Sequence, residues 1–108
     1  MKLFVWRVCK GRIPTRTVLA RREVITDDRC PICTGIAETV HHALWGCKWS
    51  RKVWKEAGFG GFLPTHGEGE AFDNILRAAD SLEVSNFEFY ITIIWELWNH
   101  RNNVVWGE

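Results

Sequence analysis

The chain has 108 residues, the size of one small domain or of a piece of a larger protein, and 46% of them are hydrophobic, enough for a core. Its net charge is only +1, but residues 1–57 hold 12 Lys and Arg against 5 Asp and Glu, whereas residues 58–108 hold 2 against 8. The most apolar run, residues 87–98, contains two glutamates and is too short to span a membrane. The basic half is typical of contact with a polyanion; the alternative is that the two halves neutralise each other in the fold.

The first stretch predicts two short helices. Residues 2–10 are mostly apolar and are followed by Gly11, which favours a helix that stops there, with Cys9 as a packing residue rather than a metal ligand. Thr15 can cap a second helix over residues 16–23. Four basic side chains of this stretch are candidates for phosphate contacts, with an ordinary solvated face as the alternative: Arg12, Arg16, Arg21 and Arg22.

The centre of the chain carries the spacing Cys-x2-Cys-x8-His-x4-Cys, formed by Cys30, Cys33, His42 and Cys47. Structural zinc takes four thiolate or imidazole ligands in a tetrahedron, and two close pairs joined by a short spacer supply that geometry. We expect the first pair on a tight turn and the second on a short helix capped by Thr39. With four protein ligands no position is left for water or substrate, so the zinc would be structural rather than catalytic.

Other interpretations of these residues are weaker. A redox Cys-x-x-Cys needs a βαβ context, disulfides would leave the two histidines without a role, and a zinc deaminase needs a His-x-Glu upstream. His41 and His42 both have a tolerable spacing to Cys47, so chemistry alone leaves that choice open. Three thiolates and a neutral histidine give the zinc site a charge of −1, which Lys48 and Arg29 can offset.

The residues after Cys47 predict a helix with aromatic and basic faces. Trp49, Val53 and Trp54 share one face. The basic side chains, largely elsewhere, are further candidates for nucleic-acid contacts: Lys48, Arg51, Lys52 and Lys55. Aromatic and basic residues together can bind single strands, but the spacing of the tryptophans favours core packing.

The remainder predicts a Gly-rich linker and two helices. Residues 58–70 form the linker, with a solvated His66 and no phosphate-loop lysine. Residues 71–83 predict a helix whose apolar side is formed by Phe72, Ile75, Leu76 and Ala79. A last helix, capped by Ser85 or Asn86, runs to about residue 106. Its apolar positions follow helical spacing: Phe87, Tyr90, Ile91, Ile94, Leu97, Trp98 and Val105.

Several motifs together resemble the zinc-binding region of reverse transcriptases from plant LINE-type (non-LTR) retrotransposons. They are Trp6-Arg7, Arg12-Ile13-Pro14-Thr15, Cys30-Pro31-Ile32-Cys33, Glu38-Thr39, His42, Cys47 and Val53-Trp54, followed by the W-x-x-W-x-x-R-N type stretch of residues 93–106. The Glu-Thr-x-x-His spacing of the family selects His42 over His41. The resemblance implies a non-catalytic zinc module that helps to hold template or target nucleic acid, next to other reverse transcriptase domains.

We therefore expect a mostly α-helical protein with a Cys3His zinc knuckle and a long C-terminal helix. Residues 1–57 would form the zinc-binding domain, residues 58–70 a linker and residues 71–108 a helical segment. The expected function is nucleic-acid binding through the basic half; the alternatives are a protein-interaction module that uses the last helix, and a relic without function. Polymerase and ribonuclease H motifs are missing, so we expect no enzyme, and reduced cysteines favour a nuclear or cytoplasmic location.

Overall fold

A computed structural model describes residues 2–63 and 70–107, and helices dominate this part of the chain. The described residues form no strand beyond one isolated antiparallel bridge between Arg29 and Ala37. The helical elements are α1 (Lys2–Cys9), α2 (Arg16–Arg21), η1 (His42–Gly46), α3 (Lys48–Glu56), η2 (Gly60–Phe62), α4 (Ala71–Ser81) and α5 (Val84–Trp106). The mostly α-helical class and the long last helix are confirmed.

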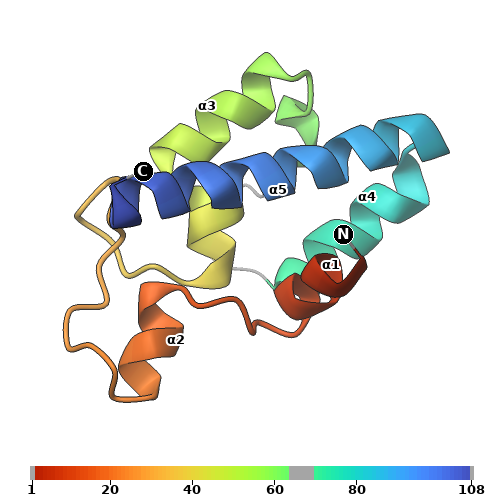
Figure 1. Cartoon of the computed structure of the whole chain (residues 1–108). Helices are drawn as coiled ribbons and strands as arrows, with labels where there is room; N and C mark the ends of the chain where they lie inside the picture. The colour runs from red at the N-terminus through yellow and green to blue at the C-terminus, as the bar shows by residue number, and fades with distance from the viewer. Residues whose placement is uncertain (1, 64–69, 108) are drawn as a thin grey trace.

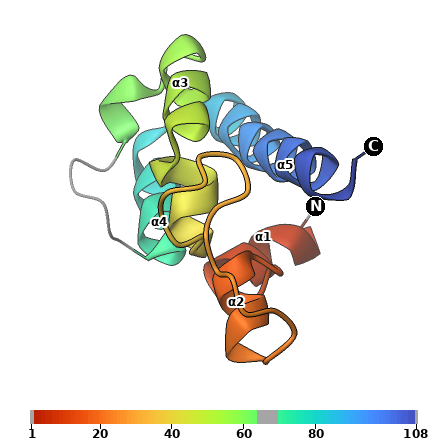
Figure 2. The same cartoon turned by 90° about the vertical axis from the view of Figure 1, so that its left-hand side faces the viewer.

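The long helix α5 organises the molecule. At a rise of about 1.5 Å per residue its 23 residues span about 35 Å, most of the 41 Å length of the protein. α3 lies on one side of α5, and α1 and α4 lie on the other (Figure 1). The view along the other axis shows α2 at the far end from α3, with the cysteine-bearing loop between them (Figure 2).

The core is built around closely packed aromatic rings. The Trp45 indole donates a hydrogen bond of 2.9 Å to the Tyr90 hydroxyl, and the rings of Trp54 and Tyr90 lie 4.5 Å apart. Phe59 packs edge-on against both of these last two rings. Trp45, Trp54 and Tyr90 are each at most 2% exposed. Large aromatic side chains from η1, α3 and α5 therefore join the two halves of the chain in one core.

The prediction that the Thr15 side chain caps α2 is wrong. Thr15 occupies the capping position, but its hydroxyl makes no capping bond. Glu38 takes this role from a distant part of the chain, since its carboxylate accepts the Arg16 N–H at 2.8 Å and its carbonyl accepts the Thr17 N–H at 3.1 Å. A capping rule that reads only neighbouring residues cannot find such a partner.

The predicted inner face of α4 is also wrong. Ile75 is buried as expected, but Phe72, Leu76 and Ala79 are exposed. The buried face is instead formed by Ala71, Asn74, Ile75 and Ala78. This face has helical spacing too, and its small alanines let α4 lie close to its neighbours. Volume at the interface, rather than hydrophobicity alone, decides which side of α4 turns inward.

α5 packs across the other helices, and these helices cover its apolar face. It begins at Val84, with Glu83 at the capping position, so the predicted cap at Ser85 or Asn86 is wrong. Of the apolar positions, all but two are buried, and Phe87 and Val105 are half-buried. The inward face of α5 is thus occupied by the chain's own core.

Part of the expected linker belongs to the core. Phe59 and Leu63 are 7% and 9% exposed, and they flank the short turn η2. Residues 64–69, with the predicted solvated His66, lie outside the described residues. The division into residues 1–57, 58–70 and 71–108 stays a prediction, although one core contains side chains from all three.

Candidate metal centre

The first cysteine pair lies in a loop that closes on itself. The bridge between Arg29 and Ala37 ties its base, and the Cys30 N–H donates to the Ile36 carbonyl at 2.7 Å. The Thr34 N–H donates to the Cys30 carbonyl at 2.9 Å, with Thr34 in the left-handed region at φ 61°. This tight turn is the one predicted for the Cys-x-x-Cys segment.

The second pair is set by a π-helical turn. In η1 the Cys47 N–H donates to the His42 carbonyl at 2.8 Å, which is the five-residue step of a π-helix. The Thr39 hydroxyl accepts the His42 N–H at 2.9 Å, so the predicted Thr39 cap is confirmed. Two side chains of α3 also bind carbonyls of the turn: the Ser50 hydroxyl donates to Ala43 O and the Trp54 indole to Leu44 O, each at 2.7 Å.

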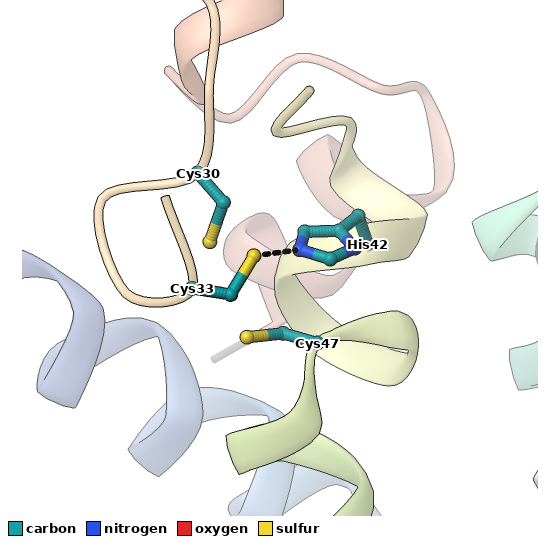
Figure 3. A group of neighbouring side chains, drawn as sticks. All are labelled: Cys30, Cys33, His42 and Cys47. Atoms are coloured by element: carbon teal, nitrogen blue, oxygen red, sulfur yellow. Dashed lines mark hydrogen bonds between the residues drawn. The ribbon is translucent and has the colours of Figure 1, made fainter. Parts of the chain in front are cut away.

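The four predicted ligands come together. Their ligand atoms all lie within 4.8 Å of one another, and Cys33 Sγ is 3.4 Å from His42 Nε2. Two ligands of a tetrahedral zinc lie about 3.5–3.8 Å apart, given bonds of about 2.0–2.3 Å. Figure 3 shows Cys30 and Cys33 reaching in from the loop and His42 and Cys47 from the helical side. The group therefore suits one zinc ion, and its four protein ligands leave no open position.

Three of the four ligand residues are buried. Cys30 and Cys47 are 2% and 1% exposed, His42 is 6% exposed, and Cys33 is half-buried. Three sulfurs and one imidazole are ligands that favour zinc over hard cations such as magnesium or calcium. The described cysteines form no disulfide, which agrees with a thiolate site.

The metal-free site holds protons that zinc would displace. The hydrogen bond from Cys30 lowers the pKa of Cys47 to about 7, although burial opposes the shift. The same bond and burial raise the pKa of Cys30 to about 11. The Cys30 sulfur also raises the pKa of His42 above its usual value. Zinc needs thiolates and a neutral imidazole, so binding must release protons from this cluster.

His41 points to a different environment from His42. Its ring packs at 5.9 Å from the Trp45 ring, and it lines a cavity of about 440 Å³ together with Lys10 and Arg21. It does not belong to the ligand group among the described residues. Cys9 also lies outside that group, half-buried, and burial raises the pKa of its thiol.

A comparison with protein families agrees with this geometry. The family described as zinc-binding in reverse transcriptase matches residues 1–54, half of the chain and including all four ligands. The chain belongs to this family. No curated protein and no solved structure matches the chain significantly. None of the described helices combines the length and the apolar character that a membrane crossing requires.

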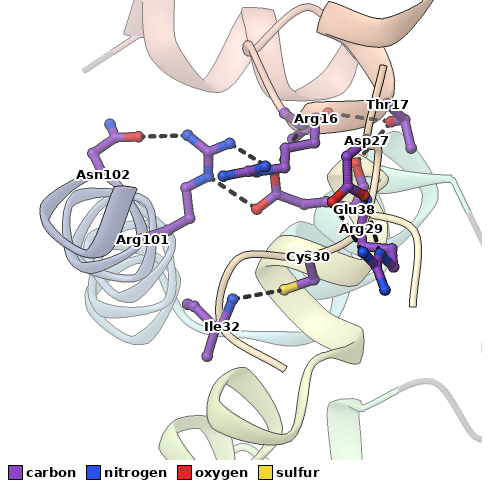
Figure 4. Close-up of polar contacts among 10 residues, drawn as sticks. Arg16, Thr17, Asp27, Arg29, Cys30, Ile32, Glu38, Arg101 and Asn102 are labelled. Carbon is purple, nitrogen blue, oxygen red and sulfur yellow. Dashed lines mark hydrogen bonds and ion pairs between the residues drawn. The ribbon is translucent and has the colours of Figure 1, made fainter. Parts of the chain in front are cut away.

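The zinc-binding region depends on a residue far outside its matched part, which the sequence did not reveal. Arg101 of α5 donates to both carboxylate oxygens of Glu38, from Nη2 at 2.7 Å and from Nε at 2.9 Å (Figure 4). Glu38 and Arg101 are 0% and 3% exposed. A buried bidentate ion pair of this kind fixes the position of α5 relative to the segment that carries Glu38. In the sequence, this ion pair was indicated only by the presence of Glu38 and Arg101 in the Glu-Thr and Arg-Asn motifs of the family resemblance.

The Glu38 pair also braces the cysteine loop. The Glu38 N–H donates to Asp28 O at 2.8 Å, next to the bridge that closes the loop, and Thr39 follows as the cap of the second ligand pair. Arg29, expected to offset the charge of the site, is instead bonded to Asp27 through both carboxylate oxygens. Those bonds lower the pKa of Asp27 to about 2. Lys48 is exposed at the start of α3, directly after Cys47.

The predicted nucleic-acid residues fall into separate places. Those of α3 share one surface depression: Lys48, Arg51, Lys52 and Lys55. Those of the first stretch do not form one patch. Arg12 lies over the Trp6 ring, Arg21 lines the cavity beside His41, and Arg22 ends α2. Arg16 is half-buried and lies near the cysteine loop.

Proposed function

We propose that this chain is a non-catalytic zinc module of a LINE-type (non-LTR) retrotransposon reverse transcriptase, of plant origin, that holds nucleic acid. Membership of the zinc-binding family and the compact Cys3His group support the first part. A site with four protein ligands has no place for a reacting water, which supports a structural role for the metal. Such a module would work in the nucleus or cytoplasm, beside the other reverse transcriptase domains.

The basic surface of α3 is the observation that carries the nucleic-acid role. Lys48, Lys52 and Lys55 are exposed along one helix, and Arg51 lines the same depression, where Glu56 is the one acidic neighbour. The helix begins directly after Cys47, so the zinc site fixes where this surface starts. Lysines in a row at helical spacing match a phosphate backbone, which is read without base specificity.

Salt dependence tests this proposal. Each lysine–phosphate contact releases a counterion, so the logarithm of the binding constant should fall linearly with the logarithm of salt concentration. Changing Lys48, Lys52 and Lys55 together to Gln should flatten that slope by about 2 for a single strand, at about 0.7 per contact. Fluorescence anisotropy with a labelled oligonucleotide measures both slopes.

The matched control changes acidic side chains of the other half. Glu83→Gln and Glu88→Gln alter exposed charges just before and within α5, and they should leave the slope unchanged. Absence of binding at low salt by zinc-loaded protein, or a slope that is the same in the triple lysine variant, contradicts the proposal.

A further inference from the structure

A groove of about 600 Å³ lies between α1 and the C-terminal half of α5. This volume is within the range of small-ligand sites, about 300–1,000 Å³. Its walls combine aromatic, basic and amide side chains: Phe4, Arg7, Arg12, Trp95, Asn99 and Asn102. The Trp-Arg and Arg-Ile-Pro motifs and the Trp-x-x-Trp-x-x-Arg-Asn motif thus meet here from opposite ends of the chain.

Trp95 is a partly exposed aromatic side chain in this groove. It is 37% exposed, and the Phe4 ring holds it edge-on at 5.1 Å between ring centroids. Trp98, one turn further on, is only 7% exposed, and the Arg101 guanidinium lies 4.7 Å from its ring centre. Trp98 is therefore a packing residue, whereas part of the Trp95 side chain is exposed in the groove and can contact a planar ligand.

The charge of the groove selects an anionic ligand. Arg7 and Arg12 are both exposed at its edge, and none of the described residues that line it carries a carboxylate. The Arg12 guanidinium lies 5.2 Å from the centre of the Trp6 ring, which limits its motion. Two guanidinium groups beside an open indole are the combination that binds a phosphate and a base of the same strand.

The amide side chains supply polar contacts in a set orientation. Asn102 Oδ1 accepts a hydrogen bond of 3.0 Å from Arg101 Nη1, and Arg101 is in turn held by Glu38. The amide nitrogen of Asn102 then points away from Arg101 (Figure 4). It remains a donor for a ligand in the groove that Asn102 lines. The buried pair that braces the zinc loop therefore also orients this group.

We propose that the groove between α1 and α5 binds single-stranded nucleic acid, with a base stacked on Trp95 and phosphates at Arg7 and Arg12. The proposal rests on the nucleic-acid role given above and adds the strand type and the place. A duplex keeps its bases stacked inside, so it cannot present a base face to Trp95. The α3 surface reads only phosphates and takes either form.

The test compares a single-stranded oligonucleotide with a duplex of the same length, by anisotropy with zinc-loaded full chain. Trp95→Leu keeps an apolar contact for Phe4 but removes the stacking face. It should weaken single-strand binding roughly 5- to 150-fold, as for loss of one stacked base, and leave duplex binding unchanged. Arg7→Gln should weaken single-strand binding and reduce its salt slope by about 0.7.

Trp106→Leu is the matched control, because Trp106 is an exposed tryptophan of the same helix outside the groove. Circular dichroism and zinc content check that each variant is folded. Equal single-strand affinity in the native chain and in Trp95→Leu overturns the groove proposal and leaves the α3 proposal standing. If the groove instead binds an acidic protein segment, the single-strand affinity will likewise be equal in the native chain and in Trp95→Leu. Failure of the native chain to bind either oligonucleotide overturns both.

Discussion

The backbone between His42 and Cys47 explains their spacing. One π-helical hydrogen bond joins the two residues, and the next residue begins α3. Gly46 lies inside this turn, where an added Cβ would be 3.4 Å from His42 Nδ1. That distance is an ordinary contact, so the spacing depends on the π-helical turn itself, whose four intervening residues bring His42 Nε2 and the Cys47 sulfur to one centre.

The choice between the two histidines gives a sharp prediction. His42→Gln should lower zinc affinity by more than the roughly 10- to 100-fold typical of losing an outer-shell partner, because a direct ligand is removed. His41→Gln should retain one metal per chain, since His41 lies against Trp45. Absorption of the cobalt-substituted proteins reports tetrahedral thiolate coordination. The account is wrong if His41→Gln loses that spectrum and His42→Gln keeps it.

Proton release gives a prediction on pH. In the metal-free site the pKa of Cys30 is about 11 and that of Cys47 about 7, and that of His42 is raised. Zinc must displace the Cys30 proton at neutral pH, the Cys47 proton as well below about pH 7, and the His42 proton on the acid side of its raised pKa. Zinc affinity should therefore rise with pH, more steeply below pH 7 than above it. Competition with a chelator at several pH values measures this, and an affinity independent of pH contradicts it.

The four zinc ligands could be predicted from the sequence, but the Glu38–Arg101 pair that holds the cysteine loop could not. Close Cys and His pairs have few other chemical uses, so spacing alone indicated zinc. Physical reasoning left His41 and His42 open, and only the family resemblance separated them. Arg101 could not be found, because a basic residue near the end of a helix is normally solvated. Its partner Glu38 is distant in sequence, and neither residue shows its burial locally.

Among the elements, α5 and the cysteine loop are coupled through one ion pair. The Glu38 carboxylate accepts hydrogen bonds from Arg101 of α5 and from the Arg16 N–H of α2, and the Glu38 carbonyl accepts the next N–H of α2, so α5 and α2 both meet the cysteine loop at one residue. Trp49 at the start of α3 also stacks on His100 of α5, with ring centres 4.6 Å apart. Helix positions were predictable from periodicity, but these long-range contacts, and with them the inner face of α4, depend on tertiary packing.

Breaking the pair should destabilise the protein strongly. Arg101→Met leaves the Glu38 carboxylate buried without its partner, at a cost of about 3–5 kcal/mol in the free energy of unfolding. Adding Glu38→Gln should recover part of that loss, because no uncompensated charge remains. Urea unfolding of the zinc-loaded variants measures both. Asp27→Asn, at the exposed pair with Arg29, is the control and should change little.

An equal stability of Arg101→Met and the native chain would show that α5 is not held by Glu38. Arg101→Lys separates charge from geometry. A lysine keeps the charge but cannot make both bonds to the carboxylate, so we expect an intermediate loss.

Across the whole molecule, the family model matches fewer residues than those that fold together around one core. The match ends at residue 54, inside α3, whereas the core includes Tyr90, Ile94 and Trp98 of α5. The radius of gyration is 13.4 Å, close to the roughly 13 Å of a compact chain of this length. Residues 93–106 resemble a stretch that follows the zinc-binding region in this family, but their apolar face was equally suited to another partner, so the sequence did not place residues 71–107 in the core of the zinc module.

Truncation tests this unit. A fragment of residues 1–57 lacks Tyr90, the partner of Trp45 and Trp54, and lacks the Arg101 guanidinium. It should lose cooperative unfolding and hold zinc more weakly than the full chain. Thermal unfolding followed by circular dichroism, with zinc titration of both chains, gives the comparison. Residues 1–57 would be an independent domain if the fragment kept the helicity that these residues have in the full chain and bound zinc with the same affinity as the full chain.

We propose that one zinc ion at Cys30, Cys33, His42 and Cys47 holds this fold together. The most direct measurement is the zinc content of protein purified without added metal, with helicity followed by circular dichroism as a chelator is added. We predict one zinc per chain and a loss of helicity that parallels metal removal, because metal binding and folding are coupled. Protein without zinc, or helicity unchanged after the metal is removed, would contradict the account.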